Sequence, residues 1–294
     1  MIYYFLPDRG RFGGVKVGAQ LVEMLVGAGA PAVLALPGGR APQWFRLSAP
    51  VIDDAEARAA ASENDWIALN WPPDYQRLAG LPGRRLVHCQ GTDLRMDPIL
   101  ADPGVLVLTC WPQASRYVRE RSGREPFEIG LAVSRCFTYD GAAKAENLVA
   151  YMPRRGYRIA RACMRSCPHL DFAPIDELDE EEVAGVMKSA GFYLATSVGE
   201  QFGLPALEAM AAGCVVASVP VRGGTDYLED GCNCVVAAPE ALPAALRSLS
   251  SRDASRRRAR LRAAALATAA RFHPALIRRR LAALLERELK ELAA

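Results

Sequence analysis

The first half of the chain alternates short apolar runs with longer amphipathic segments. The apolar runs predict strands at 2–6, 32–36, 66–70, 85–89, 105–110 and 127–131. Two longer segments predict helices at 13–26 and 112–122, the second ending before Gly123. Strands that alternate with helices in this way favour a mostly parallel sheet with helices on both faces.

The second half repeats this alternation after a break. Small residues and the Asp140-Gly141 turn interrupt the strand pattern near 136–145. Strands are then predicted at 147–152, 170–175, 191–195, 214–217 and 235–237, with helices at 158–166, 179–189, 205–212 and 239–249. The pattern predicts a Rossmann-like N-terminal domain over 1–138, a second Rossmann-like domain over 139–270, and a helix at 271–294 packing back on the first domain.

Composition and charge exclude several classes of protein. The chain has 294 residues, of which 51% are hydrophobic, and a net charge of +3. This predicts a well-buried globular protein and does not indicate a nucleic-acid partner. Because no signal peptide or run of membrane-spanning length is found, we expect a cytoplasmic protein. The arginine-rich C-terminal helices leave two interpretations open: a solvated helix face, or contact with a membrane surface or polyanion.

The cysteine pattern does not indicate a metal centre. The chain has eight cysteines, most of them within apolar runs. Cys163, Cys167 and His169 form one cluster, but they lack the paired spacing of common zinc sites. We therefore expect buried free thiols and no metal.

Residues 191–218 form the segment with the clearest chemistry. A strand, a loop, a helix opened by Pro205 and a second strand make a βαβ unit. Glu200 lies in the loop and Glu208 about one turn into the helix, so both carboxylates are predicted to reach the crevice at the strand ends. Backbone amides at the helix start suit a phosphate, and acidic side chains suit sugar hydroxyls. A nucleotide sugar carries both groups.

The same segment resembles a known family. Residues 200–213 read EQFGLPALEAMAAG, which is similar to the E-x7-E signature of retaining GT-B glycosyltransferases of the glycosyltransferase family 4 type. Gln201 departs from the usual glycine but leaves both glutamates in register. The resemblance implies a GT-B fold, in which two Rossmann-like α/β domains face each other across a cleft. The N-terminal domain would hold the acceptor, and the C-terminal domain would hold the donor.

The resemblance also assigns roles within this motif. Glu208 would bind the ribose hydroxyls of the donor, and Glu200 would act in catalysis beside the transferred sugar. The backbone amides of Phe202, Gly203 and Leu204 would meet the sugar and the diphosphate. The structural alternatives are that Glu208 is a helix-surface residue and Glu200 a solvated loop acid.

Two further segments match the family more loosely. Residues 148–155 resemble the strand and basic loop that supply cations to the diphosphate, and the candidate cations are Arg154, Arg155 and Arg158. The family's usual lysine is absent, but arginine also suits phosphate. A basic surface helix is the alternative. Gly223 and Gly224 resemble a glycine-rich loop whose amides would reach phosphate oxygens.

The N-terminal half offers weaker candidates. Gly14 and Lys16 resemble the glycine loop after the first GT-B strand, where Lys16 would face the diphosphate. An ordinary strand-to-helix turn explains them equally well. His88 is a candidate proton donor or acceptor, with a purely structural role as the alternative. Gln90 and Asp93 are acceptor-side candidates.

These observations predict a metal-independent glycosyltransferase without a cofactor, acting with retention on a nucleotide-diphosphate sugar. The acceptor is not identified and would be a glycan, a lipid-linked saccharide or a small molecule. The resemblance implies a role in polysaccharide biosynthesis. One alternative is a catalytically silent GT-B subunit that binds a nucleotide sugar or a partner. Another is a dinucleotide-dependent Rossmann enzyme, which the lack of G-x-G-x-x-G after 2–6 disfavours.

Overall fold

Two separate parallel sheets organise the computed structural model, which describes residues 1–288. Unit 1 contains residues 1–132 and the helix that begins at Pro274, and unit 2 contains Val133–His273. Residues 133–138 thus belong to unit 2 rather than to the first domain. The Val133 amide donates a hydrogen bond to Phe272 O at 3.0 Å, and the Tyr139 amide donates to Ala211 O at 3.0 Å.

Unit 1 is built on a seven-stranded sheet with the order β3-β2-β1-β4-β5-β6-β7. Its strands are β1 Ile2–Phe5, β2 Ala32–Leu36, β3 Val51–Asp53, β4 Trp66–Leu69, β5 Arg84–Cys89, β6 Val105–Thr109 and β7 Phe127–Glu128. All neighbouring strands pair in parallel. The order reverses between β1 and β4, which is the arrangement of a doubly wound Rossmann sheet.

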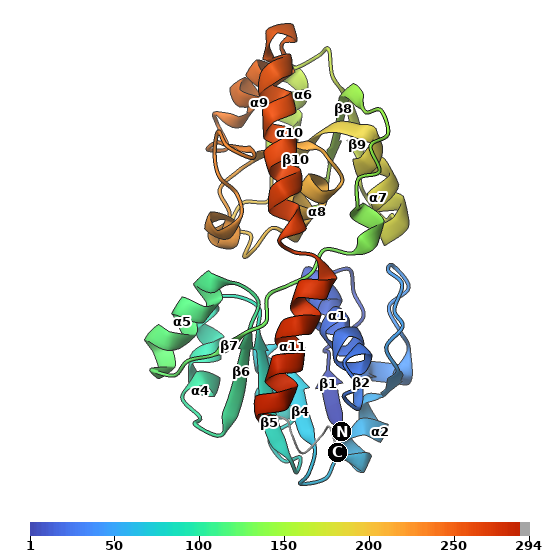
Figure 1. Ribbon diagram of the computed structural model, residues 1–294, viewed down its shortest axis with the longest axis vertical. Helices are drawn as coiled ribbons and strands as arrows, with labels where there is room; N and C mark the ends of the chain where they lie inside the picture. Colours follow the sequence, from blue (N-terminus) through green and yellow to red (C-terminus); the bar gives the residue numbers. More distant parts are fainter. Residues whose placement is uncertain (289–294) are drawn as a thin grey trace. The chain divides into compact units, whose positions relative to one another are not determined.

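Helices cover both faces of this sheet (Figure 1). They are α1 Gly13–Gly27, α2 Asp54–Ala60, α3 Pro72–Arg77, α4 Asp97–Leu100, α5 Pro112–Ser122 and α11 Pro274–Glu288. On one face, Ile277, Leu281 and Leu284 of α11 share a buried cluster with α1, so the apolar stripe of the last helix packs on unit 1. The remaining helices contribute to the cluster on the other face. Residues 289–294 of the predicted helix lie outside the described part of the chain.

Unit 2 has a five-stranded parallel sheet with the order β12-β11-β10-β8-β9. Its strands are β8 Ala145–Tyr151, β9 Asp171–Pro174, β10 Ala190–Ala195, β11 Val215–Ser218 and β12 Val235–Val236. The chain reverses direction of winding between β8 and β10. Open α/β sheets bind ligands outside the carboxyl ends of the strands at such a switch point.

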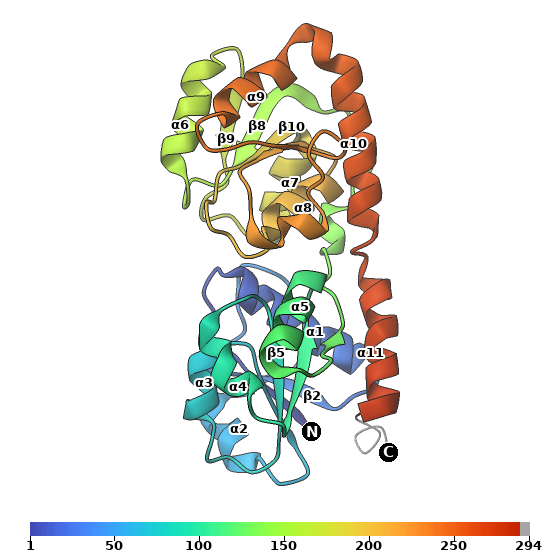
Figure 2. The ribbon, with the colours of Figure 1, turned by 90° about the vertical axis from the view of Figure 1, so that its left-hand side faces the viewer.

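The helices of unit 2 lie on the two sides of this sheet, as Figure 2 shows. They are α6 Tyr157–Ser166, α7 Glu180–Ser189, α8 Leu204–Ala211, α9 Leu242–Ser250 and α10 Ser255–Ala270. Helix α6 packs against α9, and α8 packs against α7 and α10. In α7, Asp179 and Glu182 form a reciprocal capping box that fixes the helix start. Across residues 1–288, no helix combines the length and apolar character needed to cross a bilayer.

Candidate functional site

The loops that follow β8 and β10 touch at the switch point of unit 2. Gly156 has φ 78°, and a Cβ added there would lie 2.0 Å from Thr196 O. The Thr196 hydroxyl donates a hydrogen bond to Arg155 O at 2.9 Å. Only glycine permits this backbone approach, because a side chain would overlap the Thr196 carbonyl. The two loops are therefore fixed against each other directly beyond the strand ends.

This contact brings two opposite charges together. Arg155 Nη1 donates to Glu200 Oε2 at 3.0 Å. The Arg155 side chain is 61% exposed and that of Glu200 is 27% exposed, so the pair is solvated and weak enough to exchange partners. Arg154 and Arg158, the other predicted phosphate ligands, are exposed at the same end of unit 2. The contact of Arg155 with Glu200 shows that this arginine lies at the predicted site.

A third loop, which follows β11, closes on the same place. The Arg222 amide donates to Glu200 O at 3.0 Å, and the Gly223 amide donates to Gln201 O at 2.5 Å. The Gly224 amide donates to Val221 O at 3.2 Å. In this structure the amides of Gly223 and Gly224 both donate to backbone carbonyls, and phosphate binding by these amides stays a prediction. These glycines hold the loop against the Glu200 segment.

The start of α8 is held in place by an aromatic contact. Gly203 precedes the helix with φ 83°, and a Cβ there would lie 2.9 Å from the Tyr227 hydroxyl. That hydroxyl donates to Gly203 O at 2.7 Å, and the rings of Phe202 and Tyr227 lie 4.9 Å apart. The first amides of a helix have no partner within the helix, and they carry its positive dipole end. The start of α8, at Gly203 and Leu204, therefore offers hydrogen-bond donors to an anion.

Glu208 lies one turn into α8 and is only 5% exposed. Burial raises the pKa of both Tyr193 and Tyr227, and the negative charges of Glu208 and Glu200 raise them further. Both carboxylates thus act on the same two tyrosines. The structure places Glu208 inside unit 2 near Glu200, and not on an exposed helix surface.

His88 lies in the core of unit 1. It is 1% exposed, with Nδ1 2.9 Å from the Tyr4 hydroxyl and Nε2 2.9 Å from Cys110 Sγ. Burial lowers its pKa to about 3, so the ring is neutral at ordinary pH. Both ring nitrogens are engaged and the ring is enclosed, which favours the structural alternative, while a catalytic role of His88 stays a prediction.

The predicted glycine loop of unit 1 is the start of α1 in the structure, and amide side chains hold it. Asn70 Nδ2 donates to Gly14 O at 2.8 Å, and Gln90 Nε2 donates to the same oxygen at 3.4 Å. Gln90 Nε2 also lies 3.3 Å from His88 Nδ1. In this structure Gln90 positions the loop and connects it to the buried histidine.

Asp93 and Lys16 are also committed to local structure. Asp93 accepts from the Arg95 amide at 2.9 Å and caps the short turn Leu94–Met96. The Arg95 guanidinium bonds the same carboxylate at 3.0 Å and covers the ring of Trp71 at 4.7 Å. Lys16, in the first turn of α1, is only 4% exposed. Neither side chain is presented as an isolated surface charge.

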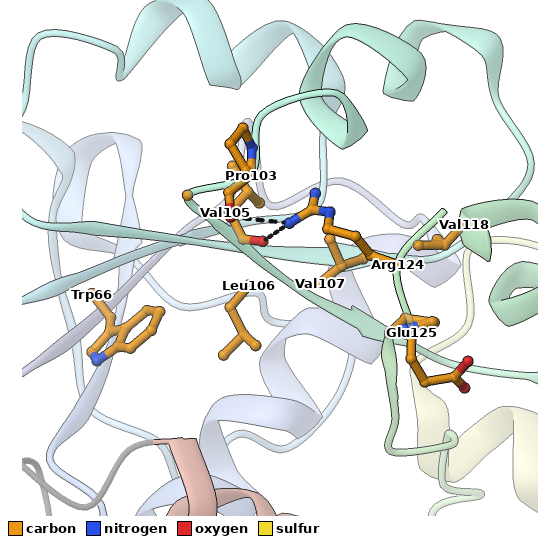
Figure 3. A pocket seen from close by; sticks show the side chains of 10 residues that line it. Trp66, Pro103, Val105, Leu106, Val107, Val118, Arg124 and Glu125 are labelled. Carbon is orange, nitrogen blue, oxygen red and sulfur yellow. Dashed lines mark hydrogen bonds between the residues drawn. The ribbon is translucent and has the colours of Figure 1, made fainter. Parts of the chain in front are cut away.

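A hollow of about 290 Å³ lies elsewhere in unit 1 (Figure 3). Its lining includes Trp66 at the start of β4 and Val105 at the start of β6. Arg124 borders it but donates to Pro103 O at 3.2 Å and to Val105 O at 2.9 Å. The hollow therefore lies at the amino ends of the strands, where Arg124 binds backbone carbonyl groups.

Three buried polar residues of unit 2 escaped the sequence analysis. Thr196 and Tyr227 make the hydrogen bonds to Arg155 O and Gly203 O described above. Asn233 Nδ2 donates to Tyr227 O at 2.8 Å and to Thr268 Oγ1 at 2.9 Å. A polar residue directly after a strand was the only available signal for Thr196. Within residues 1–288, no group of three or more His, Cys, Asp or Glu side chains is arranged to hold a metal ion.

Comparison with known proteins extends this description. Residues 166–252, which include Glu200 and Glu208, match the family model "Glycosyl transferases group 1". No curated protein sequence matches the chain. Sucrose-phosphate synthase from Thermosynechococcus elongatus superposes with a TM-score of 0.76 at 15% identity, over 99% of this chain and 100% of that one. The chain has the GT-B glycosyltransferase fold.

Two further structures share this GT-B architecture. HepE from Anabaena, solved in complex with UDP-glucose, superposes with a TM-score of 0.70 at 15% identity, over 97% of this chain and 99% of that one. A glycosyltransferase from Rickettsia africae gives 0.73 at 12% identity, with 98% of each chain covered. The predicted fold is confirmed, and together with the matched family segment it supports a glycosyltransferase.

Proposed function

We propose that this protein transfers a sugar from a nucleotide-diphosphate donor to an acceptor, with retention at the anomeric carbon and without a metal ion. The observation that carries the proposal is the convergence of three loops at the switch point of unit 2. That convergence joins a cation, a carboxylate and the start of α8. Such a site suits a ligand that has both an anionic diphosphate and a hydroxyl-rich sugar.

The donor would be bound through two kinds of group. Glu208 accepts hydrogen bonds from the ribose hydroxyls, since a carboxylate has acceptor sites for two neighbouring O–H groups. The first amides of α8 donate to the diphosphate, and Arg155 adds a positive charge with bidentate geometry. Because HepE was solved with UDP-glucose, this donor is the first to test.

The same groups serve the reaction. The bond between the anomeric carbon and the diphosphate oxygen breaks, and the oxygen keeps the electron pair. A bond then forms from the anomeric carbon to the acceptor hydroxyl, whose proton passes to the leaving diphosphate. Negative charge grows near Arg155 and the α8 amides, while positive charge on the sugar ring is stabilised by Glu200.

Arg155 exchanges partners during donor binding in this proposal. In the structure it pairs with Glu200 at 3.0 Å. A diphosphate, carrying more negative charge than one carboxylate, draws the guanidinium away and releases Glu200 to face the sugar. Donor binding would thereby prepare the catalytic carboxylate.

The proposal is tested by a thermal-shift screen against UDP-, GDP-, ADP- and TDP-sugars, since a ligand that binds the folded state must stabilise it. Transfer and hydrolysis are then assayed with the stabilising donor in radiolabelled form. We expect Glu208→Ala to weaken donor binding and Glu200→Gln to lower turnover strongly. Stabilisation without turnover would instead indicate a silent binding subunit. A response to NADH alone would indicate a dinucleotide enzyme.

A further inference from the structure

Helix α6 has two unlike faces. Its apolar residues Ala160 and Cys163 are buried in the core of unit 2. Arg158, Arg161 and Arg165 are exposed and follow the i, i+3, i+7 spacing that places residues along one side of a helix. The three arginines extend over roughly 10 Å, given the rise per helical residue. The helix is therefore anchored by one face and presents a line of positive charge on the other.

Among the described residues, this positive charge is not neutralised by an ion pair. Residues 152–170 contain five arginines and no Asp or Glu. In the part of the chain that the structure describes, Arg158, Arg161 and Arg165 form no ion pair. The neighbouring helix α9 also lacks acidic residues and adds the exposed Arg247. We call Arg158, Arg161, Arg165 and Arg247 the arginine face.

The ends of α6 and α9 lie close together. His169 Nε2 lies 2.9 Å from the Ser250 hydroxyl. Burial raises the pKa of Cys167, and the positive charge of Arg247 opposes this rise. Helices α6 and α9 pack against each other, so Arg247 and the three α6 arginines belong to neighbouring helices.

The basic run of α10 differs from this face. Arg262 pairs with Glu146 at 2.8 Å, and Arg258 lies 3.4 Å from the same carboxylate. Part of the charge that suggested membrane contact from the sequence is thus neutralised within unit 2. Figure 2 shows α6 and α10 on opposite sides of unit 2. A flat surface that contacts one of these helices cannot contact the other at the same time.

An exposed aromatic side chain adjoins the arginine face. Tyr157 is 51% exposed, and the Arg161 guanidinium lies 6.0 Å from its ring centre. Tyrosine, with an apolar ring and a polar hydroxyl, favours the boundary between water and lipid. Exposed positive charges along one helix side suit an extended anionic surface.

We propose that the arginine face docks unit 2 on the surface of an anionic lipid bilayer. Helix α6 keeps its apolar face in the core, so binding is electrostatic and involves no insertion. The proposal goes beyond sugar transfer and does not depend on it. It places membrane contact on α6 and not on α10, where the sequence had left such contact open as one of two interpretations.

The test is co-sedimentation of the full chain with vesicles of phosphatidylcholine, alone or mixed with phosphatidylglycerol. We compare Arg161→Gln/Arg165→Gln/Arg247→Gln with the matched triple Arg256→Gln/Arg257→Gln/Arg260→Gln, which removes the same charge from α10. Each arginine near an anionic surface contributes about fivefold to binding, so the first triple should lose roughly a hundredfold. The α10 triple should stay near the parent, and neither should bind phosphatidylcholine alone.

A triple lysine variant at the same three positions keeps the charge and should keep vesicle binding. Thermal unfolding of every variant checks that the fold is intact. Equal losses from both glutamine triples would overturn the proposal, because net charge alone would then explain binding. It would equally be overturned if the parent ignored anionic vesicles but bound a soluble polyanion such as heparin through these arginines.

Discussion

The carboxyl edges of the two sheets both carry polar residues, but these residues make different kinds of contact in the two units. In unit 2, Arg155 and Glu200 meet at an exposed ion pair where three loops converge. In unit 1, His88 and Gln90 at the corresponding edge bond to buried or backbone groups of the same unit. A switch point supplies a location for a ligand, and in unit 2 charged groups at this location keep access to solvent.

The largest expected effect is a difference in sugar-transfer activity between variants at these two edges. Glu200→Gln should lower turnover by about 10²- to 10³-fold, the loss typical of removing one electrostatic partner of a transition state. His88→Asn should lower the melting temperature but keep turnover per folded molecule, because the ring is enclosed. Radiolabelled transfer assays and thermal melts measure both. If His88→Asn lost turnover while it remained folded, and Glu200→Gln did not lose turnover, the result would favour a catalytic role for His88.

The next effect concerns the loop contact that builds the site in unit 2. Gly156→Ala should lower the free energy of unfolding by about 3 kcal/mol or more, since positive φ and a direct overlap with Thr196 O add together. Gly141→Ala is the matched control. Gly141 has φ 86° with no atom within 4 Å of an added Cβ, so its cost should be only about 1–2 kcal/mol. Urea denaturation measures both costs. Equal losses of unfolding free energy in the two variants would contradict the argument that the close approach of Gly156 to Thr196 O requires glycine.

Much of the fold could be predicted from hydrophobic periodicity, because buried parallel strands are continuous apolar runs. The short elements were missed: β3 has only three residues, and α2, α3 and α4 are too short to show helical periodicity. The Glu200 and Glu208 motif was legible because its spacing is local. The partners of His88 were not, since Tyr4 is 84 residues away in the chain and meets it only after the sheet has formed.

A further effect should appear in the pH dependence of stability. The pKa of His88 is about 3 in the folded state, against an ordinary 6.5. The unfolded chain therefore binds a proton first, and stability falls as pH drops from the higher value towards the lower one. The slope is about 1.4 kcal/mol per pH unit. Urea titrations should show this slope reduced in His88→Asn and retained in His169→Asn, and an unchanged slope in His88→Asn would contradict the burial argument.

The aromatic contact at the start of α8 gives a prediction of similar or lesser size. Tyr227→Phe removes a buried hydrogen bond to Gly203 O and should cost about 1–2 kcal/mol of unfolding free energy. Tyr139→Phe, which removes an exposed hydroxyl contact to Ala142 O, should cost less. Donor affinity should fall in the Tyr227 variant, because the helix start becomes less rigid. Unaltered stability and affinity would show that this contact does not position α8.

The exchange of Arg155 between Glu200 and the donor is tested most directly by calorimetric titration with a free nucleoside diphosphate. The titration compares the parent, Glu200→Gln, Arg155→Ala and the double variant, with Arg161→Ala as a control for general charge. We expect Glu200→Gln to tighten binding by up to about fivefold, the range of an exposed ion pair, because Arg155 is released. In the Arg155→Ala background the same change should have little effect. Equal tightening in both backgrounds, or weaker binding in Glu200→Gln alone, would contradict the account.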